Sequence, residues 1–471
     1  MKMFYLAGAV IVAAFFSGCT RIPSNSDQSV ANLVSSRIAK EVHWHRSCFE
    51  DERLREIIQD MICQELSVDM AVQVALLNNP RIQEAFEDIG IAQADLIEAG
   101  LLSNPVFEGF IRYPDKKGLK INTEISVMQN FLDVFLIPLK TRIATAELQQ
   151  AIYETSNTII DLSFEVEETY YELIAAYKRR ELIKFFIDIA EIENQISLAQ
   201  RNVGNINKLD QQLRTAQYLE KTVELVDAEK EIIQLREKLN KLMGLTGCDI
   251  CWSVEQELPY IPDMEPSLAC LELIAFNERL DILAARWEIE RFRRSFPTAE
   301  WWAFTQLQAG VNSERDTDGV RVIGPQFSAA LPIFNFGQAA KRRFLAQFRQ
   351  AQDRLATLEI KAYAEVREAR DILLVLRNQV IFYAGRILPN QQQILTSTEE
   401  LYNVMGTGVF DLLDNKRNQL QAYLNYYMAL RDYWTARVEL DKAVGGKLYL
   451  IGSTYQDMEN QDECCEVGGT F

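Results

Sequence analysis

The sequence predicts a mainly helical protein with a small β part, built from a duplicated unit of helix, strand pair and long helices. The duplication shows in residues 239–244 and 440–445, which are similar and lie about 200 positions apart. Residues 79–82 and 277–280 are related by nearly the same offset. Between Pro138 and Gly204 there is neither glycine nor proline, and short stretches elsewhere alternate between apolar and polar residues.

Residues 1–18 are predicted to form a secretory signal of the lipoprotein type. Lys2 precedes an apolar run of about 13 residues, which is too short to span a bilayer. The segment 16–19 (FSGC) resembles a bacterial lipobox, after which a signal peptidase would leave Cys19 as a lipidated, palmitate-bearing N-terminus. An ordinary signal with an incidental cysteine is the alternative. The residue after the cysteine is Thr20. An aspartate at this position would resemble a signal that retains lipoproteins in the inner membrane, so threonine favours the outer membrane.

Residues 19–65 form the predicted N-terminal extension, and the first repeat occupies residues 66–247. Ser67 and Asp69 open its first helical pattern. The stretch after Pro138, if it is one helix of about 65 residues, would extend roughly 100 Å. Helices in globular proteins average only about 11–12 residues, so such a length requires support from neighbouring helices.

The end of this repeat carries an apolar seam with alternating spacings of three and four. The seam consists of Leu225, Ala228, Ile232, Leu235, Leu239 and Leu242. One repeat later, the equivalent positions are Tyr426, Ala429, Tyr433, Ala436, Leu440 and Ala443. Both seams predict antiparallel coiled-coil packing.

Each repeat also contains a predicted strand pair, at about 106–113 and 119–130 in the first and at about 302–312 and 320–331 in the second. In the first pair, Ile121, Thr123, Ile125 and Val127 alternate with polar residues, as expected for a lipid-facing strand with a wet inner face. Trp301 and Trp302 at the start of the second pair fit an aromatic belt at the membrane interface.

Strands of about ten residues match the length of a tilted membrane strand. Four strands cannot close a barrel, and open edges are not tolerated in lipid. The protomers are therefore expected to share one barrel, as a dimer with about eight strands or a trimer with about twelve. No later stretch approaches about 18 uninterrupted apolar residues, so no helix is predicted to span the membrane.

The remaining segments are a linker at residues 248–270, the second repeat at 271–452 and an acidic, flexible tail at 453–471. Without Cys19, seven cysteines remain. Cys248 and Cys251 have the spacing of half a zinc site, but the second half is absent, so a local disulfide or free thiols are expected and no metal site is predicted.

Composition and motifs limit the function classes. The chain has 49 basic and 67 acidic residues, a net charge of -18, which excludes a phosphate backbone as the main partner and so argues against nucleic acid. It contains no glycine-rich phosphate loop, HExxH motif or nucleophile elbow. We therefore expect neither enzymatic activity nor a cofactor.

Four segments resemble the TolC family of outer membrane efflux proteins: residues 76–96, 101–105, 331–338 and 402–414. They are similar, in order, to the family's opening helix, its entry into the first strand, the passage into the long second-half helix, and the inner helix end that narrows the periplasmic mouth. The likeness covers about residues 66–450. It implies a homotrimer with a twelve-stranded β-barrel in the outer-membrane lipid and a helical tunnel in the periplasm. It also implies docking to an inner-membrane pump through a periplasmic adaptor protein.

The resemblance also implies a gate at the periplasmic end, with Tyr402, Thr407, Asp411 and Asp414 at its positions. In the family a tyrosine and an arginine tie this constriction shut. Tyr402 matches the tyrosine, whereas Thr407 stands at the arginine's position, so the closing bonds must differ. Asp411 and Asp414 are three residues apart and therefore face the same side of a helix. Three copies around an axis would crowd six carboxylates and attract cations.

The sequence thus predicts a passive export duct in the outer membrane, gated at its periplasmic end and powered by the pump. The alternative is a structural coiled-coil envelope lipoprotein without a pore, which does not explain why strand pairs occupy equivalent places in both repeats.

Overall fold

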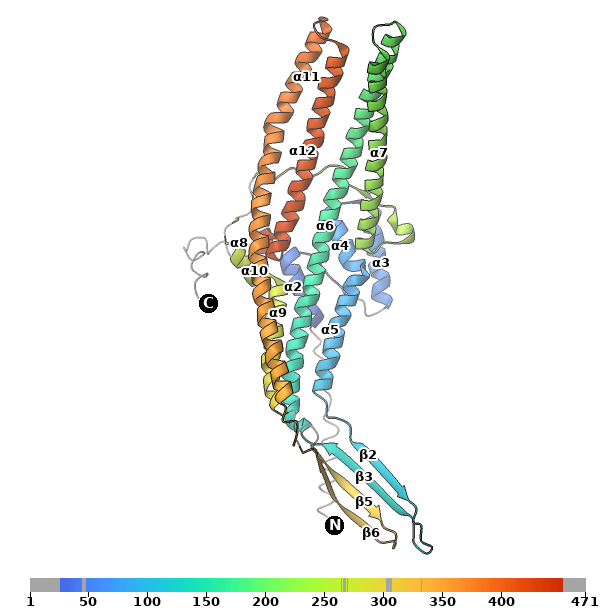
Figure 1. Cartoon of the computed structure of the whole chain (residues 1–471), viewed down its shortest axis with the longest axis vertical. Helices are drawn as coiled ribbons and strands as arrows, with labels where there is room; N and C mark the ends of the chain where they lie inside the picture. Colours follow the sequence, from blue (N-terminus) through green and yellow to red (C-terminus); the bar gives the residue numbers. More distant parts are fainter. Residues whose placement is uncertain are drawn as a thin grey trace. The chain divides into compact units, whose positions relative to one another are not determined.

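The computed structural model describes residues 26–44, 48–263, 265, 268, 270–301, 307–331 and 333–451. The chain is 73% helical, which confirms the mainly helical fold. It divides into two compact units, and the long helices continue from one into the other (Figure 1). The predicted signal, Cys19, Trp302 and the acidic tail lie outside the described residues.

Unit 1 contains a four-stranded antiparallel sheet, formed by β2 (Val106–Arg112), β3 (Asn122–Asn130), β5 (Leu307–Arg315) and β6 (Arg321–Ala329). The strand order is β2-β3-β5-β6, so the pair from each repeat meets the other through β3 and β5 (Figure 1). Gly310 allows this meeting, because a Cβ atom there would lie 2.0 Å from the Val127 carbonyl oxygen.

The cross-strand register gives this sheet two different faces. One face carries polar groups that bond across the strands: Asn122 donates to Glu314 (2.7 Å) and Asn312 donates to Glu124 (2.7 Å). The other face carries most of the exposed large apolar side chains, namely Phe107, Ile111, Ile125, Val127, Val311, Ile323 and Phe327. Val106, Phe110 and Val322 are exposed on the polar face. The predicted period-two alternation is confirmed in β3.

Two predicted positions at the strand ends were wrong. Helix α9 (Leu280–Trp301) continues through Trp301, so this residue does not start a strand. Residues 302–306 lie outside the described residues, and the described part of β5 begins at Leu307. β3 begins at Asn122 rather than 119, because the Lys120 amide bonds the Thr317 carbonyl (2.9 Å) in the neighbouring turn.

Unit 2 contains most of the helices. The long ones are α6 (Asp133–Asn202), α7 (Lys208–Met243), α10 (Gln338–Phe382), α11 (Leu388–Asn403) and α12 (Val409–Val444), of which α6 and α10 start in unit 1. A single π-helical turn, η3 (Tyr383–Ile387), joins α10 to α11. The shorter elements are α2 (Ser26–Ile38), α3 (Cys48–Ile62), β1 (Glu65–Leu66), α4 (Val68–Asn78), α5 (Pro80–Ala99), η1 (Gly247–Ile250), β4 (Ser253–Val254), α8 (Leu271–Glu278) and α13 (Leu448–Ile451). The first residues of α2 and the part of α5 from Phe86 on belong to unit 1.

The duplication predicted from sequence is visible at the ends of α7 and α12. Gly244 and Gly445 end these helices with φ values of 69° and 94°, where a Cβ atom would meet the backbone at Asn78 and at Arg279, respectively. Side chains at the α4–α5 and α8–α9 junctions donate hydrogen bonds to carbonyl groups near the ends of α7 and α12. Asn79 donates to the Leu242 carbonyl (2.7 Å), and Arg279 donates to the Ala443 carbonyl (3.1 Å).

Both predicted seams lie inside unit 2. Ala228, Ile232, Leu239 and Leu242 are buried on α7, while Leu225 and Leu235 are half-buried. On α12 all the equivalent positions except half-buried Tyr426 are buried. The seam positions therefore form the core that holds the long helices together.

The linker is tied to unit 2 by a buried acid. The Glu265 carboxylate accepts bonds from the Tyr433 hydroxyl and from Arg437, and it lies 3.5 Å from Arg377 Nε. Arg377 also donates to the Asp263 carbonyl (2.7 Å). The stretch Gln338–Asn403, which includes Arg377, is long and apolar enough to cross a membrane by composition, with 11% of its most apolar window buried. This finding concerns length and composition alone, and Arg377 within the stretch contacts the linker.

Cys63, Cys248 and Cys251 are free and exposed, whereas Cys270 is disulfide-bonded. The alternative of free thiols therefore holds for the pair at 248 and 251. No group of three or more metal-ligating side chains occurs among the described residues.

Candidate functional site

The candidate site is formed by two helical hairpins of unit 2, α6–α7 and α11–α12, whose turns are equivalent in the two repeats (Figure 1). In the first turn Gly204 adopts a φ of +81°, and in the second Met405 adopts a φ of +59°. Both turns require a left-handed residue at the same place, which glycine adopts without strain and methionine does not.

The turns expose apolar side chains. Val203 is 72% exposed and Leu209 is 63% exposed at the first tip, and Val404 and Met405 are 74% and 94% exposed at the second. Large apolar groups at a loop tip lower solubility without stabilising the fold. Each tip thus carries two large apolar side chains that are mostly exposed.

Asp411 caps the start of α12. Its carboxylate accepts from the Gly408 amide (3.1 Å) and from the Thr407 hydroxyl (2.8 Å). Gly408 has no side chain that could cap the helix, so the acid at the third helical position bonds back to it. The structure therefore joins two predicted gate residues, Thr407 and Asp411, within one turn.

Asp414 points to a different partner. Its carboxylate forms an ion pair with Arg417, one turn further along α12. Tyr402 is 41% exposed, and its side chain makes no hydrogen bond within the described part of the chain. Asp411 thus caps α12, and Asp414 is paired with a cation.

The strongest polar link between the hairpins was not predicted. Glu193 on α6 has a side chain that is only 1% exposed, and it binds Arg214 on α7 (3.1 Å) and Arg417 on α12 (3.2 Å). Arg214 also lies over the Phe410 ring, 5.0 Å from its centre. One buried acid therefore holds two arginines from two helices, and Arg417 connects it to Asp414.

An apolar cluster supports this polar link. Leu182, Phe186 and Ile189 on α6 pack against Leu420 on α12, with Leu413, Tyr423, Leu424 and Tyr427 around them. Asn415 donates to Thr398 (3.0 Å) between α11 and α12. Sequence spacing could have indicated only the Asp414–Arg417 pair, because Glu193 and Arg214 lie far away along the chain.

Comparison with known proteins shows what the chain is similar to. Residues 274–446 match the model of the outer membrane efflux protein family. The second repeat of the chain is therefore similar to this family. This confirms the resemblance found in the sequence, together with the efflux-channel function and the outer-membrane location expected from it.

Known outer membrane efflux proteins resemble the chain over most of its length. The chain is 22% identical over 386 residues to the cobalt-zinc-cadmium resistance protein CzcC of Cupriavidus metallidurans. The match covers 81% of this chain and 90% of that protein. The fold is similar to the Campylobacter jejuni CmeC outer membrane channel, with a TM-score of 0.68, 16% identity and coverage of 85% and 90%. It is also similar to the open state of the Neisseria gonorrhoeae MtrE outer membrane channel, with a TM-score of 0.65, 14% identity and coverage of 81% and 89%.

Proposed function

We propose that the chain is one protomer of a homotrimeric duct that carries material passively from the periplasm to the exterior. The observation that carries this proposal is the sheet of unit 1. Polar groups bond across the strands on one face, and most of the exposed large apolar side chains lie on the other, which suits a wet lumen on one side and lipid on the other.

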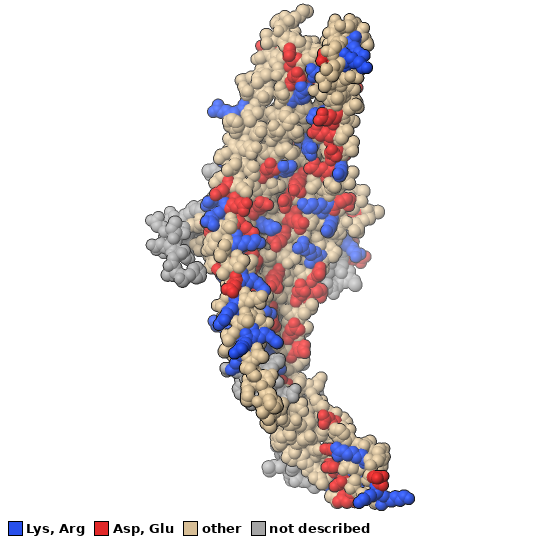
Figure 2. All heavy atoms as spheres, viewed as in Figure 1, with Lys and Arg blue, Asp and Glu red and all other residues tan. Residues whose placement is uncertain are grey.

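The same sheet supports the shared barrel. β2 and β6 each pair with one neighbour within the described chain, so each leaves an unpaired edge. Open edges are not stable in lipid. Three copies that pair β2 with β6 of the next protomer would close a barrel of about twelve strands. Figure 2 shows charged side chains gathered toward the turn end of the sheet, as expected if the remainder faces lipid.

The helices of unit 2 supply a second contact between protomers. One exposed face of α7 carries large apolar side chains: Leu209, Leu213, Leu219, Val223, Val226 and Ile233. On α10, Ile360 and Val375 are 70% and 67% exposed. In the trimer these faces would pack against neighbouring copies, enclosing a tunnel.

The exposed tips are the proposed docking surface for a periplasmic adaptor protein, through which the inner-membrane pump would supply energy. Their apolar side chains suit a protein partner, since apolar contacts dominate the centre of most protein interfaces. The polar link behind the tips is the proposed gate: Glu193, Arg214 and Arg417 hold the two hairpins together, in place of the arginine that Thr407 replaces.

Lipid attachment at Cys19 would add an anchor to the outer membrane. A single acyl chain binds membranes only weakly, whereas a lipidated cysteine with several chains, together with a barrel, is held firmly. Incorporation of labelled palmitate tests this attachment.

The duct differs from a pore-free envelope lipoprotein in two measurable ways. The purified protein is expected to run as a trimer on an unheated detergent gel, and to conduct ions in a planar bilayer. A monomer that gives no conductance would overturn the proposal and favour the structural lipoprotein.

The charge of the mouth is tested by the double variant Asp411→Ser, Asp414→Ser. Removing two carboxylates per protomer is expected to lower cation selectivity in bilayer recordings, because three copies bring these groups close to one axis. If the double variant leaves selectivity unchanged, the mouth is not acidic.

A further inference from the structure

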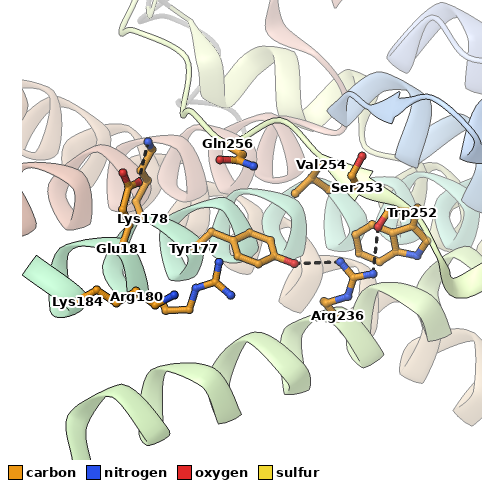
Figure 3. A pocket seen from close by; sticks show the side chains of 10 residues that line it. All are labelled: Tyr177, Lys178, Arg180, Glu181, Lys184, Arg236, Trp252, Ser253, Val254 and Gln256. Carbon is orange, nitrogen blue, oxygen red and sulfur yellow. Dashed lines mark hydrogen bonds and ion pairs between the residues drawn. The ribbon is translucent and has the colours of Figure 1, made fainter. Parts of the chain in front are cut away.

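A cavity of about 290 Å³ lies in unit 2 between α6, α7 and the segment around β4, away from the hairpin tips (Figure 3). Its charged lining consists of four cations, Lys178, Arg180, Lys184 and Arg236, and one acid, Glu181. The whole chain carries a net charge of -18. A positive cavity in so acidic a protein is a local arrangement that composition does not predict.

Three of the four cations have no carboxylate partner within the described chain. Lys178 is neutralised, because it pairs with Glu181 (3.2 Å) and approaches Glu257 (3.8 Å). Arg236 donates only to neutral oxygens: the Tyr177 hydroxyl (2.9 Å) and the carbonyl groups of Ile250 (3.2 Å) and Trp252 (3.1 Å).

Arg180 and Lys184 form no ion pair with any described residue. The Arg180 guanidinium lies 5.2 Å from the centre of the Tyr177 ring, and its buried Nε has no hydrogen-bond partner. Lys184 is exposed and lies next to Arg180 in Figure 3. A buried donor without an acceptor is rare in native proteins, and a bound acceptor would explain it.

The cavity is built to keep these groups in place. Tyr177, Arg180 and Lys184 are spaced by three and four residues, so they share one face of α6. Across the cavity, Arg236 lies over the Trp252 ring at 4.1 Å, and Trp252 Nε1 donates to Asn240 (2.7 Å). The third side is formed by residues 252–256, which β4 fixes by pairing with β1.

We propose that this cavity binds a small organic anion with two or more carboxylate groups. Guanidinium and ammonium groups are the side chains that bind carboxylates, and the planar guanidinium can bond both oxygens at once. A volume near the lower end of small-molecule pockets, roughly 300–1,000 Å³, sets the size of the ligand. Periplasmic carboxylates of this kind occur as free organic acids and in the peptide stems of the cell wall.

The test uses the full-length protein purified in detergent at low salt, with isothermal titration of two probes, citrate and a soluble cell-wall peptide stem. Wild type is expected to bind at least one probe saturably, with one site per protomer. Citrate binding identifies a free acid as sufficient, and binding of the peptide stem alone identifies the cell wall as the source.

Arg180→Gln and Lys184→Gln are each expected to weaken binding by at least about tenfold, as loss of one charge-assisted bond does. The matched control is Lys230→Gln, which removes an exposed charge from α7 outside the cavity. Circular dichroism and the unheated gel establish that each variant folds.

Two results would overturn the proposal: no saturable binding of either probe by wild type, or equal weakening by Lys230→Gln. Tighter binding of inorganic pyrophosphate than of both probes would overturn the assignment to carboxylates. None of these outcomes bears on conductance, so the site and the duct are tested separately.

Discussion

At the scale of single residues, the C-terminal end of α12 encloses three buried charges. Lys447 pairs with Glu167 and lies 3.8 Å from Asp441, whose carboxylate also accepts from the Leu448 amide (3.1 Å). Burial raises the pKa of Glu167 and of Asp441, although Lys447 acts in the opposite direction. Burial alone would lower the pKa of Lys447, but the two carboxylates raise it above its usual value.

Replacing Lys447 with methionine is expected to destabilise the protein by about 3–5 kcal/mol, because two buried carboxylates lose their cation. An acid whose folded pKa is raised stabilises the fold less as pH rises from its unfolded value through the folded one. The loss of unfolding free energy caused by Lys447→Met should therefore be larger at pH 8 than at pH 5. Thermal unfolding at both pH values measures this.

Lys442→Met provides the comparison, since it removes an exposed lysine from the same end of α12. This variant should leave the midpoint of thermal unfolding nearly unchanged at both pH values. Equal midpoints for the Lys447→Met variant and wild type would show that the cluster does not stabilise unit 2.

At the scale of elements, the gate depends on one helix holding two others. The Glu193 side chain is inaccessible to water and is bonded to arginines of α7 and α12. Because α6 and α7 form one hairpin and α12 belongs to the other, this residue sets how closely the hairpins lie. An opening motion must break the Arg417 bond or carry Glu193 with it.

Glu193→Gln is therefore expected to favour the open mouth and raise single-channel conductance. The neutral amide leaves two arginines without their carboxylate, and breaking a buried pair typically costs about 3–5 kcal/mol. Glu191→Gln, an exposed change two residues away on α6, should conduct like wild type. A folded Glu193→Gln trimer with wild-type conductance would show that this link does not close the channel.

The elements themselves were largely predictable, because their signals are local. The seams of α7 and α12 follow a three-and-four spacing, and the strand pairs follow a period of two, each visible within a short window. The gate network was not predictable from the sequence, because Glu193, Arg214 and Arg417 meet only after the hairpins pack. The capping role of Asp411 was not predicted, because its spacing from Asp414 shows only that both lie on one helix face. The prediction that Trp301 starts a strand was wrong for a related reason. An aromatic pair before an alternating stretch is equally compatible with the end of a helix.

At the scale of the whole molecule, the proposed trimer requires lipid on one face of the sheet and water on the other. Adjacent residues on β6 separate these two environments. Phe327 lies on the apolar face and is 76% exposed, while Gln326 lies on the opposite face with the polar residues. In a soluble monomer, both faces would meet water and a charge would be tolerated on either.

Phe327→Glu and Gln326→Glu therefore form a matched pair in which only the direction of the side chain differs. A charge on the lipid face of a barrel costs up to about 2–4 kcal/mol at the bilayer centre, and less for acids than for basic residues. Phe327→Glu should lower the amount of heat-sensitive trimer in the outer membrane, whereas Gln326→Glu should assemble normally because its carboxylate faces the lumen. Three copies amplify the difference, since each trimer would place three charges in lipid. If both variants assemble equally well, the apolar face does not contact lipid, and the exposed side chains of the sheet must be covered by protein instead.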